Sequence, residues 1–178
     1  MAPARYAIER GDWKAAAALQ VRPSPLPHVQ AITHFARALG AARSGDRDAA
    51  TLDINRLGEL RDKLRDAKDA YWSEQVDIQV QVAAAVLLYA AGKFDDALNA
   101  LAAAADAEDR TEKHPVTPGV PKPARELYGA MLLEGGRAKE ALAAFEATLK
   151  KSQIGWCLYG RRQGRCPARR QAAGPRLL

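Results

Sequence analysis

The stretch AAGKFDDALNAL at residues 90–101 is the best guide to the fold, because three close relatives of it occur elsewhere in this 178-residue chain. These relatives are IERGDWKAAAAL at 8–19, AARSGDRDAATL at 41–52 and EGGRAKEALAAF at 134–145. Each copy has a glycine that an alanine follows five positions later, and successive glycines are 34, 47 and 44 residues apart. A unit of this length that recurs along a chain is typical of helical repeat arrays.

The glycine and the alanine of each copy have different expected roles. We expect the glycine to allow a tight turn between two helices, and the small alanine to let those helices approach closely. The glycines are Gly11, Gly45, Gly92 and Gly136, and the alanines are Ala16, Ala50, Ala97 and Ala141. Apolar residues at helical spacing and a high alanine content support the same interpretation. The predicted helices are 4–10, 12–21, 28–44, 46–67, 70–91, 94–108, 123–135 and 138–151, which makes an all-α protein.

Charge divides the chain into a body at 1–152 and a basic tail at 153–178. Six of the 27 Lys and Arg residues lie in the tail, which leaves 21 in the body against all 21 Asp and Glu residues. The body is therefore neutral, and the tail is rich in Gly, Arg and Pro, which predicts irregular structure. Both cysteines, Cys157 and Cys166, lie in the tail at a spacing that fits no common zinc or redox pattern. Its composition fits either a native basic tail or a shifted reading frame, and both alternatives stay open.

Hydropathy gives an expectation about localisation. No apolar run reaches the roughly 20 residues that a membrane-spanning helix needs. The N-terminal residues MAPARYAIERGDW lack the apolar stretch of a secretory signal. We therefore expect a cytoplasmic protein with no membrane association.

The stretches YAIERGDWKAAAAL and LLYAAGKFDDALNALAAAA resemble the tetratricopeptide repeat family. The resemblance covers residues 5–151, and DAYWSEQVDIQ and PARELYG are also similar to a bacterial subset of that family. It implies helix-turn-helix repeats that stack into a short superhelix, and a scaffold for protein–protein interactions. The chain departs from the family in two long intervals between copies and in Arg37, which stands where the family usually has an apolar residue.

The family phasing also implies a concave binding groove, lined by the first helix of each repeat. The expected groove residues are Phe35, Leu39, Gln79, Val82, Val86, Tyr89, Glu126 and Leu133. Chaperone-binding members of the family grip a terminal carboxylate with Lys, Asn and Arg at such positions, whereas this set is mostly apolar. We therefore expect an apolar peptide or helix as the ligand. The alternative is that the valines and leucines of this set belong to the core.

Catalysis, metal binding and nucleic-acid binding are weaker alternatives. His34 falls at a packing position of a predicted helix, which favours a structural histidine over a catalytic one. The acids of 106–112 together with His114 could hold a hard cation, but a solvated helix end explains them better. The Arg-rich tail could bind nucleic acid by releasing counterions, although few aromatic residues lie among its arginines. We expect no catalytic residue, no metal and no cofactor.

The two ends of the array predict a homodimer. The first copy has a short leading helix to cover Trp13 and Leu19, and Phe145 and Leu149 lead into a segment with no apolar stripe. Exposed rows of large apolar side chains exceed what a monomer usually presents. Contact between two copies through an end of the array would cover them.

Overall fold

A computed structural model of the chain describes residues 2–111 and 120–151. These residues form an all-α structure in which no strand occurs. The helices are α1 Ala2–Arg10, α2 Trp13–Ala17, α3 Pro27–Ser44, α4 Arg47–Asp66, α5 Ala70–Ala90, α6 Phe94–Arg110, α7 Ala124–Glu134 and α8 Ala138–Lys151. The tail predicted at 153–178 lies outside the described residues.

The four repeated glycines make the four predicted turns. Their φ angles are 63° at Gly11, 88° at Gly45, 80° at Gly92 and 79° at Gly136, in the left-handed region that only glycine adopts without strain. In each turn the residue after the glycine donates its N–H to a carbonyl one turn back in the helix, as Asp46 does to Ala41 at 3.0 Å. This arrangement satisfies carbonyls that the helix end leaves unpaired. The turn prediction is confirmed.

The alanines that follow the glycines also lie where they are predicted to lie. Their exposed fractions are 0% for Ala16, Ala50 and Ala97 and 1% for Ala141. A larger side chain there would push the paired helices apart.

Aspartates begin three of the helices. Asp12 accepts a hydrogen bond from the N–H of Ala15, and Asp46 accepts one from the N–H of Ala49. Asp69 does the same for Trp72, although the turn before it has Lys68 rather than glycine, with a φ of 57°. These caps satisfy N–H groups of the first helical turn, which fixes the start of each helix.

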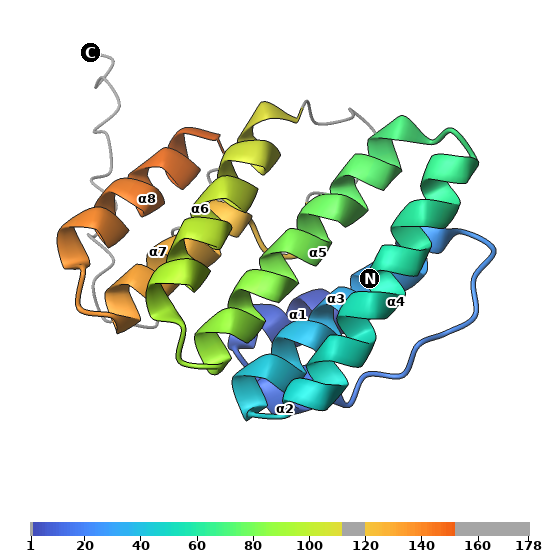
Figure 1. Cartoon of the computed structure of the whole chain (residues 1–178), viewed down its shortest axis with the longest axis horizontal. Helices are drawn as coiled ribbons and strands as arrows, with labels where there is room; N and C mark the ends of the chain where they lie inside the picture. Colours follow the sequence, from blue (N-terminus) through green and yellow to red (C-terminus); the bar gives the residue numbers. More distant parts are fainter. Residues whose placement is uncertain (1, 112–119, 152–178) are drawn as a thin grey trace, which may run out of the picture.

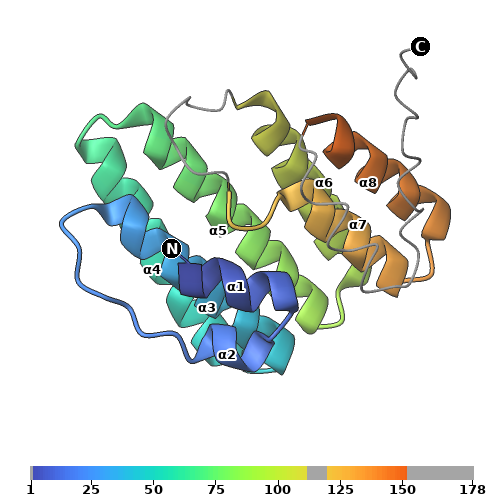
Figure 2. The same ribbon diagram turned by 180° about the vertical axis from the view of Figure 1, so that it is seen from behind.

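Helices that follow one another in the chain pack together from α1 to α8, and α3 also contacts α1 and α5. Figure 1 shows α4, α5 and α6 side by side, with α8 at the C-terminal end of the row. The view from behind in Figure 2 shows α1, α2 and α7 on the opposite face. Within the described residues no contact of comparable extent joins α5 to α7. The buried apolar side chains form one core that takes residues from α1 and from every helix from α3 to α8.

The second helix differs from its prediction. It ends at Ala17, four residues before the predicted end at 21. The chain then runs without helix to Leu26, and Arg37 of α3 donates a hydrogen bond from Nη1 to the carbonyl of Leu19 at 2.9 Å. A side chain of α3 thus donates a hydrogen bond to a backbone carbonyl of this non-helical segment.

The ends of the array expose less apolar surface than the sequence predicts. Phe145 is buried at 7% exposure, while Trp13, Leu19 and Leu149 are partly buried. The expected rows of exposed Trp, Phe and Leu are therefore wrong, although one large apolar side chain of α8, Leu142, is 51% exposed. The homodimer itself stays a prediction. Among the described residues, no helix has the length and the apolar character needed to span a membrane.

Candidate functional site

Most of the predicted groove residues are buried in the core. The exposed fractions are 2% for Phe35, 1% for Leu39, 2% for Val82 and 1% for Val86. These four side chains belong to the common apolar core, as the alternative interpretation of the sequence held. The expectation that they line an open groove is therefore wrong, because a side chain without exposed surface cannot contact a ligand in this conformation.

Two of the remaining groove residues, Gln79 and Glu126, are polar and also buried, with exposed fractions of 8% and 4%. Glu126 pairs with Lys122 one helical turn earlier, across the start of α7. A buried carboxylate needs such a partner, because an unpaired charge away from water is costly. The charge of Glu126 is therefore already paired with Lys122, in the segment just before α7.

Long-range contacts close the inner side of the array. Arg5 of α1 donates from Nη2 to the carbonyl of Val120 at 3.2 Å, just before α7. At the C-terminal ends of α3 and α7, Arg43 of α3 forms two hydrogen bonds with Glu134 of α7, at 2.7 and 2.8 Å. These contacts thus join the first and the last parts of the chain. The predicted groove residues of α3 and α5 are themselves covered by the packing of neighbouring helices in the common core.

The Arg43–Glu134 pair is the centre of a cluster that we call the clasp, made of Trp13, Arg43, Tyr89 and Glu134. The guanidinium carbon of Arg43 lies 5.5 Å from the Trp13 ring centroid and 5.7 Å from the Tyr89 ring centroid. A guanidinium beside aromatic faces and bound to a carboxylate at two points has few alternative positions. Four helices, α2, α3, α5 and α7, are joined in this way.

The environment of Tyr89 reflects its place in the clasp. Burial and then the negative charge of Glu134 raise the pKa of the Tyr89 phenol, and a hydrogen bond to Glu134 raises it further. The positive charge of Arg43 lowers it in part. The phenol therefore stays protonated and available as a donor to Glu134.

Beside the clasp, Phe94 presents a large apolar ring to solvent. It is 55% exposed, and its ring meets the Tyr89 ring edge to face at a centroid distance of 5.0 Å. Tyr89 and Leu133 are the two predicted groove residues that keep part of their surface exposed. We call the combination of the clasp and Phe94 the clasp surface. The sequence contained a signal for it, because Trp13 and Phe94 both stand two places after a turn glycine.

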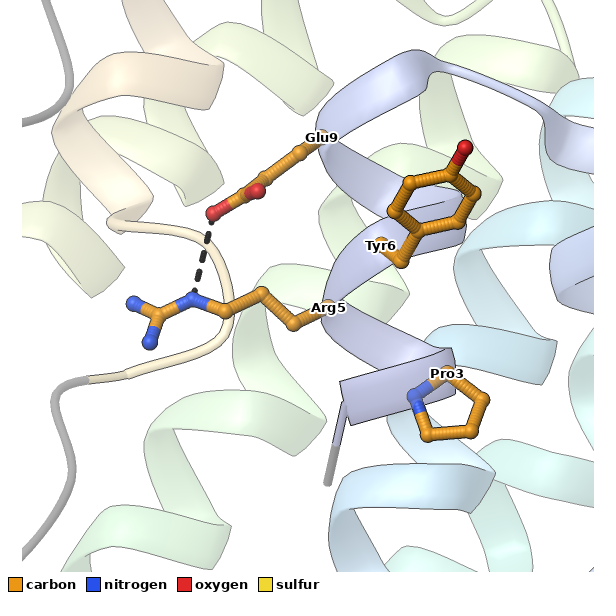
Figure 3. A pocket seen from close by; sticks show the side chains of 4 residues that line it. All are labelled: Pro3, Arg5, Tyr6 and Glu9. Atoms are coloured by element: carbon orange, nitrogen blue, oxygen red, sulfur yellow. Dashed lines mark ion pairs between the residues drawn. The ribbon is translucent and has the colours of Figure 1, made fainter.

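A second surface feature is a shallow hollow of about 430 Å³ on α1, lined by Pro3, Arg5, Tyr6 and Glu9. Figure 3 shows Arg5 and Glu9 on the side toward the segment before α7, and Pro3 and Tyr6 on the other side. The Arg5 and Glu9 side chains pair with each other at 3.1 Å. The one cation and the one anion in the lining of the hollow pair with each other. The lining has no further charged group that could bind a ligand.

His34 belongs to a buried ion network rather than to a catalytic arrangement. Its Nδ1 lies 2.7 Å from a carboxylate oxygen of Asp53, and Arg37 donates from Nε to the same carboxylate at 3.0 and 3.1 Å. Asp53 is 3% exposed, so the pairing compensates for burial of its charge. Arg37, which departs from the family pattern, is thereby explained as the partner that ties α3 to α4.

The acidic helix end serves local structure. Asp106 and Asp109 pair with Arg125, and the carboxylate of Glu108 accepts the N–H of Ala124 at the start of α7. The predicted contributions of Glu112 and His114 lie outside the described residues. In the part of the chain that is described, no three His, Cys, Asp or Glu side chains gather as a metal site would require.

Comparisons with protein-family models, with curated proteins and with solved structures find no significant match.

Proposed function

We propose that the protein is a tetratricopeptide-like helical repeat array that binds another protein and catalyses no reaction. Support for the architecture comes from four helix–turn–helix units with a left-handed glycine and a buried alanine at the same places. The described polar side chains favour a binding role over catalysis, because they already bond to one another. The networks of His34, Asp53 and Glu126 are satisfied internally and stabilise helix packing.

The observation that carries the proposal is the exposed ring of Phe94 on a rigid support. Protein interfaces concentrate their binding energy in a few residues, most often Trp, Tyr and Arg. Binding costs less conformational entropy when such side chains are already ordered in the free protein. On the clasp surface, the Arg43 guanidinium lies over the Trp13 and Tyr89 rings, and the Tyr89 ring in turn packs edge to face against Phe94. We propose this surface, and not a concave groove, as the contact face.

Affinity capture from lysate of the source cells, with matched variants, tests the proposal. Phe94→Ala removes the exposed ring, and Leu52→Ala serves as the control, because Leu52 is 60% exposed on α4 and has no place in the clasp. We expect at least one discrete protein to be retained by the parent chain and by Leu52→Ala, and to be reduced about tenfold or more with Phe94→Ala. Equal retention by all three chains would contradict the clasp surface as the contact face. The absence of any retained protein would contradict the binding role.

A further inference from the structure

The α7–α8 pair is internally tight. The ring of Phe145 on α8 lies so close to Gly129 on α7 that an added Cβ would be 2.8 Å from ring atom Cε1. Leu127, Met131 and Leu132 of α7 are at most 2% exposed. Close packing of this kind makes two helices move as one body.

The attachment of this pair to the other helices differs from its internal packing. Outside the pair itself, only α6 has an extensive helix–helix contact with α7 among the described residues. At the N-terminal end of α7, Arg125 pairs with Asp106 and Asp109 of α6. At its C-terminal end, the clasp joins Glu134 to Arg43 and Tyr89.

These polar attachments are partly open to water. The side chain of Arg43 is 15% exposed and that of Glu134 is 42% exposed, while Asp106 and Asp109 are 60% and 35% exposed. Ion pairs with one exposed partner are weakened by salt, whereas apolar packing is not. The bonds that fix the two ends of α7 are therefore more sensitive to conditions than the bonds within the α7–α8 pair.

We propose that α7–α8 is a releasable unit, which opens as one body while α3, α4 and α5 stay folded, and whose closure is controlled by the clasp. Opening breaks the Arg43–Glu134 pair and moves α7 away from α3, with which it has no extensive helix–helix contact. Parts of a protein open with free energies below that of global unfolding when few apolar contacts hold them. The proposal goes beyond the binding role, because it describes a motion of the free protein and needs no partner.

Two matched variants test this motion by amide hydrogen exchange. Glu134→Gln keeps the size of the side chain at the clasp but removes its charge, and it replaces one of the two oxygens that accept from Arg43 with an NH2 group that cannot accept. Glu140→Gln is the control, since Glu140 also forms a two-point pair, at 2.6 and 2.8 Å, but with Arg137, so this pair does not reach the other helices. Both variants retain the apolar core and should fold.

In Glu134→Gln we expect exchange at Met131, Leu132 and Phe145 to become about tenfold faster, the effect of losing one charge-assisted bond. Exchange at Phe35 and Val82 should remain at the parent rate, and Glu140→Gln should alter neither group. Raising the salt concentration should reproduce the effect in the parent chain. The proposal is overturned if both groups of amides accelerate together, if neither does, or if Glu140→Gln accelerates α7–α8 equally.

Discussion

The α3–α4 and α7–α8 pairs contain the same turn but are attached to the molecule differently. Each has a glycine with a positive φ angle, followed by a buried alanine. The α3–α4 pair lies among α1, α2 and α5, and a buried network centred on Asp53 joins its two helices. The α7–α8 pair packs against α6 and is fixed at both ends of α7 by partly exposed ion pairs. A repeated local motif thus determines the helix pair, whereas residues outside the motif determine how firmly that pair is held.

Asp53→Ala should produce the largest loss of stability, because it leaves Arg37 and His34 without their buried acceptor. Breaking a buried ion pair by removing one partner costs about 3 kcal/mol or more. Urea unfolding measures the change. Asp62→Ala is the control, because Asp62 pairs with Arg61 at a position where the Asp62 side chain is 54% exposed. That control should leave the free energy of unfolding nearly unchanged, because an exposed ion pair contributes little, and an equal loss in both variants would show that the network is unimportant.

Gly40→Ala should be the next most damaging change. An added Cβ on this α3 residue would overlap the backbone nitrogen of Ala17 and the carbonyl oxygen of Trp13. Backbone cannot rotate away as a side chain can, so we expect a loss of about 2–3 kcal/mol in urea unfolding. Gly58→Ala on α4 is the control, because no atom lies within 4 Å of its Cβ position. This control should gain about 0.5–1 kcal/mol, as alanine favours a helix more than glycine does.

Gly129→Ala makes the corresponding change in α7 and should have a smaller effect. The three atoms nearest to the added Cβ all belong to the Phe145 ring, which is a side chain and not backbone. We expect a loss of about 1–2 kcal/mol, accompanied by faster hydrogen exchange within α7–α8. A loss larger than that of Gly40→Ala would show that α7–α8 is the more rigidly held of the two pairs.

Lys68→Gly should stabilise the protein. Lys68 lies two residues after the end of α4 and has a φ of 57°. It stands where glycine stands in the other four turns. Glycine removes the strain of a side chain in the left-handed region, which is worth about 1 kcal/mol. Lys63→Gly, in the last turn of the same helix, should instead lower the melting temperature, because glycine weakens a helix. A lower melting temperature in Lys68→Gly would mean that the turn does not need glycine.

Local sequence predicted the helices and turns well, because their determinants lie within a few residues of one another. Gly92 and Ala97 mark a turn and a close helix contact without reference to the rest of the chain. The early end of α2 could not be predicted in this way, since Arg37 takes the Leu19 carbonyl from a different helix.

The candidate site was predicted less well, because it too depends on contacts between residues that are far apart in the chain. Arg43 and Glu134 are 91 residues apart, so no local pattern indicates that they form two hydrogen bonds. The repeat pattern alone makes the inner faces of α3 and α5 resemble an open groove. In the folded chain Val82 and Val86 are core residues, whereas Phe94 of α6 is exposed.

Thiol labelling of the purified protein measures directly whether the inner face is closed. In a chain with Cys157 and Cys166 replaced by serine, a single cysteine is placed either by Val86→Cys or by Phe94→Cys. Val86 is 1% exposed and Phe94 is 55% exposed. A buried thiol reacts only when its region opens, so we expect Val86→Cys to react about 100-fold more slowly than Phe94→Cys, or slower still. Similar labelling rates at the two positions would contradict the account, and would restore the open groove that the sequence predicts.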